Sequence, residues 1–353
     1  MTDDPAGKPP RQRVRLLEVA EEAGVSRAAA SLALRHHPSI PAATRQRIEA
    51  AARKLGYVYN RGAASLRTAS THTVGIIVHD VTNPYFAEIV ATIQDEMSAS
   101  GRVVLFGNTQ ESPERQREFI DTFREYNVDG IVLCPAAGTD PEDIRTVHRS
   151  GLPVVLFSRD LPELSVDYVG GANRDGMRLI TEHLVALGHR RIAMIGVNET
   201  IATGRDRLRG YEDALLAAGI EPDPALMVTG PATRMFGMEA MSRLMERDVG
   251  ITAVAAFNDV LAFGAMLGLR QRGLEPGIDV SVTGFDDLTE ARMWSPQLTT
   301  VGFSREALGQ GAASLLRRRI AAPDAPPQRI VIDTTLTIRA SSQFLREAVT
   351  GPA

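Results

Sequence analysis

The chain has 353 residues, of which 44% are hydrophobic and 23% charged, with a formal net charge of −4. These fractions are typical of a soluble globular protein, and the length exceeds what one compact core holds, so two or three domains are expected. No apolar run approaches the roughly 18–20 residues of a membrane span, which argues against a membrane protein.

Charge is divided unevenly along the chain. Residues 11–73 hold eleven Arg or Lys and four Glu, a net of +7, and residues 1–10 contribute −1, which leaves −10 for residues 74–353. A basic head on an acidic body is expected of a DNA-binding module joined to a domain that does not bind DNA. Residues 1–12, with three prolines and early acids, are expected to be a disordered lead rather than a signal peptide.

The stretch 16–35 reads LLEVAEEAGVSRAAASLALR and predicts two short helices, at 16–23 and 27–35. Gly24-Val25-Ser26 separates them, with Ser26 placed to cap the second helix. Two helices joined by a three-residue turn with glycine are typical of a helix-turn-helix, whose second helix fits the DNA major groove. The apolar positions that recur at helical spacing in the first helix are Leu17, Ala20 and Ala23.

A third helix is predicted to begin after Pro41, which suits a first helical turn, and to stop at Gly56, a good C-terminal cap. Residues 13–58 are therefore expected to form an all-α DNA-binding domain. Residues 59–73 hold a short segment weakly inclined to helix, followed by small polar residues that lead into the rest of the chain.

From residue 74 on, short apolar runs alternate with amphipathic helices. Continuous apolar runs are typical of strands covered on both faces, so the alternation predicts two successive parallel, doubly wound α/β layers. The expected strands are 74–78, 103–106, 130–133, 154–157, 192–195, 226–228, 253–257 and 281–283. The expected helices are 84–100, 113–126, 141–150, 174–187, 205–218, 236–247, 259–272 and 304–319. Cys134, the single cysteine, ends one apolar run and is interpreted as a small buried hydrophobe in a protein of the reducing cytoplasm.

Beyond these patterns, the chain resembles the LacI-type (LacI/GalR) transcriptional regulators over residues 13–342. The matching phrases include LLEVAEEAGVS (16–26), TRQRIEAAARKLGYVYN (44–60), NPYFAE (83–88), VDGI (128–131), LGHRRIA (187–193), FND (257–259), TGFDD (283–287) and PQLTTV (296–301).

The resemblance implies a helix-turn-helix head, a hinge helix, and a two-lobed body like the periplasmic binding proteins over residues 74–345. The first lobe would hold residues 74–172 and 303–332. The second would hold 173–302 and 333–345, with hinge connections near 172–174, 300–304 and 333–335.

In the resembling family, paired hinge helices enter the minor groove and a leucine from each wedges the central base step open. Leu66 stands at that position, and such wedging costs a few kcal/mol of unstacking that contacts to the bent DNA offset. In the second helix Ala28 and Leu32 replace the polar residues of many relatives, so Arg27 is the best candidate for a bidentate contact to guanine. The expected DNA-binding residues are Ser26, Arg27, Ala28, Ser31, Thr44, Arg45, Asn60, Ala63 and Leu66.

Gly62 lies inside the expected hinge helix, where glycine costs about 1 kcal/mol relative to alanine. The hinge is therefore expected to form when DNA is bound, and Gly62→Ala should bind operator more tightly and respond less to effector. Thr44, Arg45 and Arg47 are expected to contact phosphates rather than bases.

The resemblance also places an effector site between the lobes. Carboxylate, amide and guanidinium groups there suit the vicinal hydroxyls of a sugar, and Phe86 suits the apolar face of its ring. A nucleobase or another small polar metabolite fits the same set, and Ser158 stands where relatives often have an acid, so the ligand stays open. The expected effector-binding residues are Tyr85, Phe86, Ser158, Arg159, Arg207, Asn258 and Asp286.

Enzymatic function is not expected, because the chain lacks a GxSxG elbow, a P-loop and a His/Cys cluster with metal spacing. We therefore expect no catalytic residue, no metal and no cofactor. A secreted two-lobed sugar carrier is disfavoured, because it would need a signal peptide and no basic head, and the sequence meets neither requirement. The favoured function is a dimeric, cytoplasmic, ligand-controlled repressor of a pseudo-palindromic operator. An activator, and either induction or corepression by the ligand, stay open. The terminal SSQFLREAVTGPA shows no apolar heptads, which disfavours a tetramer.

Overall fold

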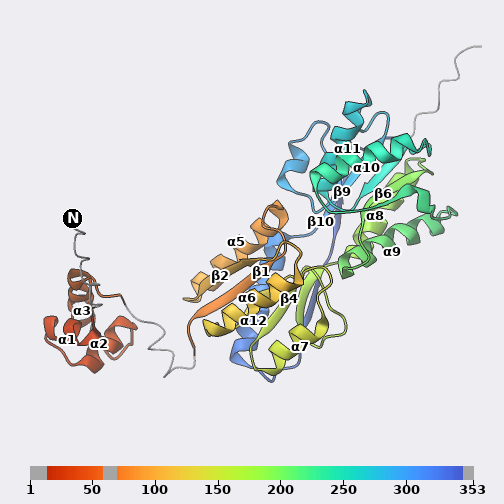
Figure 1. Ribbon diagram of the computed structural model, residues 1–353. Coiled ribbons are helices and arrows are strands. Elements are labelled where there is room, and N and C mark those ends of the chain that lie inside the picture. Colours follow the sequence, from red (N-terminus) through yellow and green to blue (C-terminus); the bar gives the residue numbers. More distant parts are fainter. Residues whose placement is uncertain (1–13, 59–69, 345–353) are drawn as a thin grey trace, which may run out of the picture. The chain divides into compact units, whose positions relative to one another are not determined.

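The computed structural model describes residues 14–58 and 70–344 (Figure 1). The chain divides into two compact units, residues 1–71 and 72–353, which are described separately. The predicted hinge residues Asn60, Gly62, Ala63 and Leu66 lie outside the described residues. No helix within the described ranges is long and apolar enough to cross a membrane.

Three helices form the first unit: α1 (Leu16–Glu22), α2 (Arg27–Leu34) and α3 (Ala42–Leu55). As predicted, the Ser26 hydroxyl caps α2 by accepting a hydrogen bond from the Ala29 backbone N–H at 3.1 Å. Gly56 ends α3 in the left-handed region with φ +68°, which glycine adopts at little cost. The small core between the helices consists of Val19, Ala20, Ala23, Ala30, Ala33, Ile48, Ala51 and Ala52.

The inner face of α1 includes Leu16 rather than Leu17. Leu17 is 52% exposed, whereas Leu16 packs against the core. Leu16, Val19, Ala20 and Ala23 follow the spacing i, i+3, i+4 and i+7, which lines one side of a helix. Of the three apolar positions noted at helical spacing, Leu17 therefore lies outside this core, whereas Ala20 and Ala23 belong to it.

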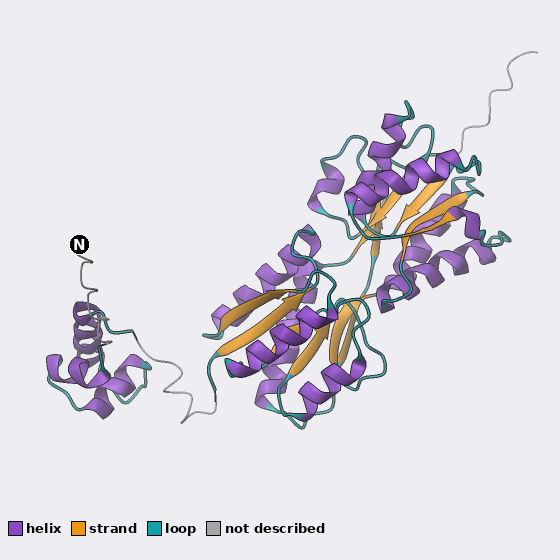
Figure 2. Ribbon diagram, viewed as in Figure 1, coloured by secondary structure: helices purple, strands orange, loops and turns teal. Residues whose placement is uncertain are grey.

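The second unit contains two six-stranded sheets flanked by helices (Figure 2). The strand order is β11-β5-β4-β3-β1-β2 in the first sheet and β12-β10-β9-β8-β6-β7 in the second. Every pairing is parallel except that of β12 with β10. The strands are β1 (Thr73–Val78), β2 (Val103–Asn108), β3 (Ile131–Leu133), β4 (Val154–Phe157), β5 (Asp167–Gly171), β6 (Ile192–Val197), β7 (Met227–Thr229), β8 (Ala253–Ala256), β9 (Ser281–Phe285), β10 (Thr299–Gly302), β11 (Arg329–Ile332) and β12 (Thr335–Thr337). The α-helices are α5 (Pro84–Ala99), α6 (Pro113–Glu125), α7 (Pro141–Arg149), α8 (Asn173–Ala186), α9 (Ala202–Ala217), α10 (Arg234–Glu246), α11 (Asp259–Gln271) and α12 (Arg305–Ala321). Two short 3-10 helices, η1 (Pro224–Leu226) and η2 (Thr289–Arg292), complete the set.

Four strands, β5, β10, β11 and β12, were not among those the sequence predicted, and α9 begins three residues before the predicted Arg205. Strand β10 (Thr299–Gly302) covers most of residues 300–304, which the family resemblance implied to be a hinge connection. These strands read DYVGG, TTVG, RIVI and TLT and are three to five residues long. They escaped prediction because they are short and because the Gly- and Thr-rich ones lack a continuous apolar run.

The chain passes between the two sheets at three places. It crosses from β5 to α8 over residue 172, from β10 to α12 over 303–304, and from β11 to β12 over 333–334. Helix α8 packs on strands of the second sheet and α12 on strands of the first. The second unit therefore consists of two lobes joined by three short connections, with the first lobe built on β1 and the second on β6.

Candidate functional site

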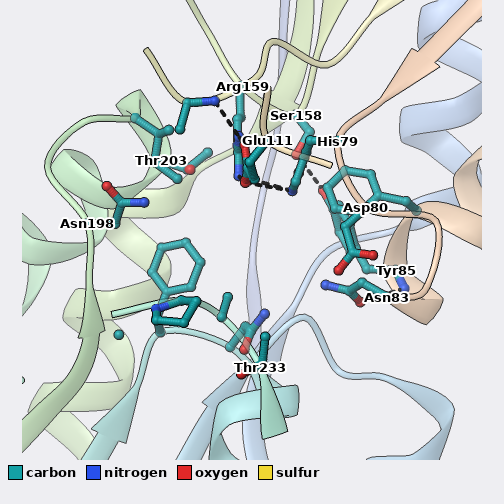
Figure 3. Close-up of a pocket in the computed structure, with 18 of the residues that line it drawn as sticks. His79, Asp80, Asn83, Tyr85, Glu111, Ser158, Arg159, Asn198, Thr203 and Thr233 are labelled. Atoms are coloured by element: carbon teal, nitrogen blue, oxygen red, sulfur yellow. Dashed lines mark hydrogen bonds and ion pairs between the residues drawn. The ribbon is translucent and has the colours of Figure 1, made fainter. Parts of the chain in front are cut away.

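A cavity of about 600 Å³ lies between the lobes, where the carboxyl ends of strands from both sheets meet (Figure 3). Loops after β1, β2, β3 and β4 supply one wall, and loops after β6, β7, β8 and β9 supply the other. Such strand ends are where ligands bind in parallel α/β folds. All seven residues predicted for effector binding lie in this lining: Tyr85, Phe86, Ser158, Arg159, Arg207, Asn258 and Asp286.

On the second lobe, the wall is organised by Arg207, a buried residue of α9. Its Nε donates to Asn173 Oδ1 at 2.9 Å and its Nη1 to the Phe257 carbonyl. The guanidinium lies 3.6 Å from the Phe285 ring centroid, so it is held by an aromatic face as well as by hydrogen bonds. Its Nη2 donates to Asp286 Oδ1 at 3.4 Å. An ion pair of Arg207 and Asp286 therefore lines the cavity.

Asp286 follows β9 and is 4% exposed. Burial raises the pKa of its carboxyl group to about 6, although the positive charges of Arg207 and Arg305 oppose the rise. Its backbone φ is +114° and that of Asp287 is +46°, conformations that non-glycine residues rarely adopt. The carboxylate therefore reaches the cavity from a strained turn and titrates just below neutral pH.

On the first lobe, Arg159 supports another carboxylate, Glu111, in a two-pronged ion pair. Its Nη1 donates to Glu111 Oε2 at 2.8 Å and its Nη2 to Glu111 Oε1 at 2.6 Å. The same nitrogens also reach the Pro135 carbonyl and His79 Nε2, both at 3.0 Å. Predicted as an effector contact, Arg159 thus uses both Nη groups for hydrogen bonds within the protein, and it lies beside Glu111 in the cavity wall (Figure 3).

His79 lies beneath this ion pair. Burial and the charge of Arg159 lower its pKa to about 3, against the smaller effect of Glu111, so the ring is neutral at physiological pH. Its Nδ1 lies 3.4 Å from Cys134 Sγ. Cys134 is fully buried and burial raises its thiol pKa to about 12, so it remains a protonated, apolar neighbour, as the sequence indicated.

Aromatic residues from the start of α5 close the remaining side of the first-lobe wall. The Tyr85 hydroxyl lies 3.2 Å from Ser158 Oγ, and Phe86 packs edge-on against His79 with ring centroids 4.4 Å apart. Phe86 is 4% exposed, so most of its ring belongs to the lobe core and a limited part faces the cavity.

Four asparagines around the cavity share one arrangement: each side-chain oxygen accepts a backbone N–H. The Oδ1 of Asn258 caps α11 through Leu261 N at 3.0 Å, and the other three accept from Tyr85, Val81 and Thr200. Within the described chain, their amide nitrogens have no protein partner. This fixes the amide orientation and leaves N–H donors for a ligand. The four are Asn83, Asn108, Asn198 and Asn258.

Sequence reasoning missed several lining residues, although one signal was available. The missed residues lie one to five positions after the predicted strands 74–78, 103–106 and 192–195: His79, Asp80, Asn108, Glu111 and Asn198. The rule that ligands gather at carboxyl ends of parallel strands points to the loops that hold these residues, although not to the individual side chains.

In the first unit, the predicted readers of DNA lie at the exposed start of α2. Ser26, Arg27 and Ala28 are exposed, whereas Ser31 is 9% exposed and faces the core. Ser31 is thus poorly placed for base contact, because little of the residue reaches the surface of this unit.

The predicted phosphate contacts lie on α3. Thr44 is half-buried. Arg45 is partly committed to the loop before α3, since its Nη2 donates to the carbonyls of His37 and Ile40 at 3.2 and 3.3 Å.

Comparison with known proteins fits this two-part organisation. Residues 15–60 match the family described as bacterial regulatory proteins, lacI family, and residues 71–340 match the periplasmic binding proteins and sugar binding domain of the LacI family. The chain belongs to the LacI family. It is therefore a ligand-responsive, DNA-binding transcriptional regulator of a family that is not enzymatic, and the predicted fold class is confirmed.

Individual LacI-family proteins match along most of this chain. The HTH-type transcriptional regulator CelR of Thermobifida fusca is 35% identical, covering 94% of this chain and 99% of CelR. A solved CelR–cellobiose complex superposes with a TM-score of 0.72 at 33% identity, over 94% of this chain and all of that one. The lac repressor dimer bound to operator and the anti-inducer ONPF gives 0.84 at 26% identity with the same coverage.

Proposed function

We propose that this LacI-family protein is a cytoplasmic, homodimeric repressor whose operator binding is controlled by a sugar of about disaccharide size. The cavity carries the proposal. At about 600 Å³ it lies in the range of small-molecule sites and would hold on the order of 20 water molecules, more room than a single sugar ring needs. The solved CelR structure contains cellobiose, which supports a disaccharide for this chain.

The polar groups of the cavity suit the alternating donor and acceptor character of sugar hydroxyls. Carboxylate oxygens of Asp286 and Glu111 accept, and amide nitrogens such as that of Asn258 donate. Because these groups stand on opposite lobes, a sugar that contacts both stabilises a closed arrangement of the lobes. The remaining predicted contacts, Tyr85, Phe86, Ser158 and Arg207, complete the proposed site, with Arg159 acting through Glu111.

At the DNA, we propose that Arg27 reads a base while Ser26, Thr44 and Arg45 position the head on the phosphate backbone, with Ser31 as a minor contact. Ala28 contributes at most a contact to a thymine methyl group. The domain boundaries proposed from the sequence, with a head at 13–58, a hinge at 59–73 and the effector-binding lobes at 74–345, complete this scheme. Asn60, Ala63 and Leu66 are proposed to contact the operator centre.

Dimer formation is supported by apolar side chains on an edge strand. Val103 and Phe106 of β2 are 48% and 41% exposed, and β2 ends the first sheet, so both are available to a second copy. In the lac repressor structure the operator is bound by a dimer. A single buried cysteine fits the reducing cytoplasm, where operator DNA lies.

The test combines DNA and ligand binding by the full-length protein. Fragments from the promoter region of its own gene are titrated in a gel-shift assay, alone and with a panel of mono- and disaccharides. We expect a specific shift whose midpoint changes with at least one disaccharide. A decrease in affinity identifies induction and an increase identifies corepression. Absence of a specific shift at low salt under every condition would overturn the proposal.

A further inference from the structure

Both arginines in the cavity wall already have carboxylate partners. Arg207 pairs with Asp286 at 3.4 Å and Arg159 with Glu111 at 2.6 Å. A third carboxyl group, Asp80, accepts hydrogen bonds from the backbone and hydroxyl of Thr82 and has no cationic partner among the described residues. The lining therefore carries one more negative than positive charge, with His79 neutral.

This balance disfavours a negatively charged ligand. A phosphate or carboxylate entering the cavity must either displace a carboxylate from Arg159 or Arg207 or remain without a cation. Displacement leaves a partly buried carboxylate unpaired, and both alternatives cost free energy. An uncharged ligand that uses hydroxyl groups avoids both costs.

Glu111 is the carboxylate best placed to contact such a ligand on the first lobe. Its side chain is 41% exposed, whereas that of Asp286 is 5% exposed. Arg159 fills one acceptor site on each Glu111 oxygen, and the Ala137 backbone N–H fills another on Oε2 at 2.9 Å. Since a carboxylate has about four such sites, one remains open on a residue that lines the cavity.

The Glu111 carboxylate is also held in place before any ligand arrives. The backbone φ values of Gln110 and Glu111 are +53° and +61°, a left-handed turn that non-glycine residues adopt when the surrounding structure imposes it. The two-pronged contact with Arg159 fixes the plane of the carboxylate. Binding of a hydroxyl group to this carboxylate therefore costs little conformational entropy, because the Glu111 side chain is already ordered.

We propose that the effector is an uncharged saccharide and that Glu111 selects it, by accepting a hydroxyl hydrogen bond and by repelling anionic sugars. The proposal deepens the proposed function and rests on it, because the proposed function supplies the class of ligand. Ser158, the other polar residue of this wall that was predicted to contact effector, carries no charge, and Asp80 already accepts two hydrogen bonds from Thr82 through Oδ1. The discrimination is therefore assigned to Glu111.

The test measures binding to the full-length protein by calorimetry at low salt. The probes are cellobiose, maltose and lactose, each with its sugar alcohol and its aldonic acid. The alcohol and the acid share an open reducing end and differ in one carboxylate, so their affinity ratio isolates charge. The variants are Glu111→Gln, which keeps the shape, and Glu111→Asp, which keeps the charge. Glu114→Gln is the matched control, because Glu114 lies on the exposed start of α6 outside the cavity.

For the native chain, we expect a disaccharide to bind and its alcohol to bind at least about tenfold more tightly than its acid. Glu111→Gln should weaken the neutral sugar by about tenfold and narrow the gap between alcohol and acid, because Arg159 then lacks its carboxylate. Glu111→Asp should keep the discrimination against the acid, and Glu114→Gln should match the native chain.

Two results would overturn the assignment while leaving a sugar effector in place: an acid that binds as tightly as its alcohol, or a Glu111→Gln variant indistinguishable from Glu114→Gln. If no probe of either charge binds, the saccharide class itself is wrong, and with it the effector part of the proposed function. Thermal unfolding of each variant separates a loss of affinity from a loss of folding.

Discussion

Replacing Arg207 by methionine should destabilise the second lobe in a pH-dependent manner. The change removes the guanidinium but keeps a long apolar side chain against Phe285. Asp286 then stays buried without its nearest cation, and breaking such a buried pair costs about 3–5 kcal/mol. Protonation of Asp286 limits the cost, since a neutral carboxyl group needs no cation. Arg305 and Asp259, the other charged groups coupled to it, remain in the variant.

The sign of the pH effect follows from the pKa of Asp286. It is about 6 in the folded chain, above the ordinary value of 3.8, so the contribution of this group to stability is greatest at low pH, declines from pH 3.8 to 6 and is constant above. Without Arg207 the folded pKa is higher still, and the decline continues past pH 6 at up to about 1.36 kcal/mol per pH unit. The penalty of Arg207→Met should therefore grow by about 2 kcal/mol between pH 6 and pH 8.

Denaturant unfolding at pH 6, 7 and 8 measures this penalty. Trp294, the single tryptophan, stacks on Phe263 with ring centroids 4.6 Å apart, so its fluorescence reports the second lobe. The double variant Arg207→Met/Asp286→Asn is the control, because it has no carboxyl group to titrate at 286. A penalty for Arg207→Met that is the same at pH 6 and pH 8 would refute the charge coupling between these two residues.

Three further variants probe the head, the lobe connection and the cavity wall. Arg27→Ala should cost about 1–3 kcal/mol of operator affinity and relax preference at one base pair per half-site; equal weakening on all sequences in competition gel shifts would make Arg27 a phosphate contact. Arg305 on α12 donates to the carbonyls of Asp286 and Asp287 and pairs with Glu88 on α5, so Arg305→Met should weaken effector binding about fivefold by calorimetry. Arg317 joins α12 to α5 without touching the second lobe, so Arg317→Met should leave the affinity unchanged. Equal effects of the two variants would rule out a role of Arg305 in connecting the lobes. Gly204→Ala should lower the unfolding free energy by about 1–3 kcal/mol, because its Cβ would lie 1.7 Å from the Asn198 carbonyl oxygen. An unchanged denaturation midpoint would show that the loop containing Asn198 moves aside at no cost in stability.

The strands that the sequence predicted are mostly those with continuous apolar runs. Strand β4 (Val154–Phe157) is buried at every residue and reads VVLF, so its composition alone identifies it. Strand β11 (Arg329–Ile332) lies at the edge of the same sheet with alternating exposure, and β10 is fully buried but reads TTVG. What places β10 is its pairing with β9 and β12, a tertiary contact that no local pattern encodes.

The difference between local sequence patterns and tertiary contacts also explains why the other site residues were predicted and Glu111 was not. Arg207, Asn258 and Asp286 stand in phrases that carry the family resemblance, and all three line the cavity. Glu111 stands in the polar stretch NTQES, which has no helical or strand periodicity. Its role depends on Arg159, 48 residues further along the chain, which meets it because β2 and β4 are parallel strands of one sheet.

Backbone strain gives an independent reason to place the function at this edge of the sheets. Gln110, Glu111, Ser158 and Asp286 all have positive φ and all line the cavity, and Asp287 adds a fifth such residue beside it. Each such conformation costs free energy that surrounding contacts must offset. At Glu111 and Asp286 those contacts include the ion pairs with Arg159 and Arg207, two further residues of the cavity lining. These residues gather at the carboxyl ends of two separate sheets, so the strain and the charge pairing together favour a site in which the polar groups are set before the effector binds.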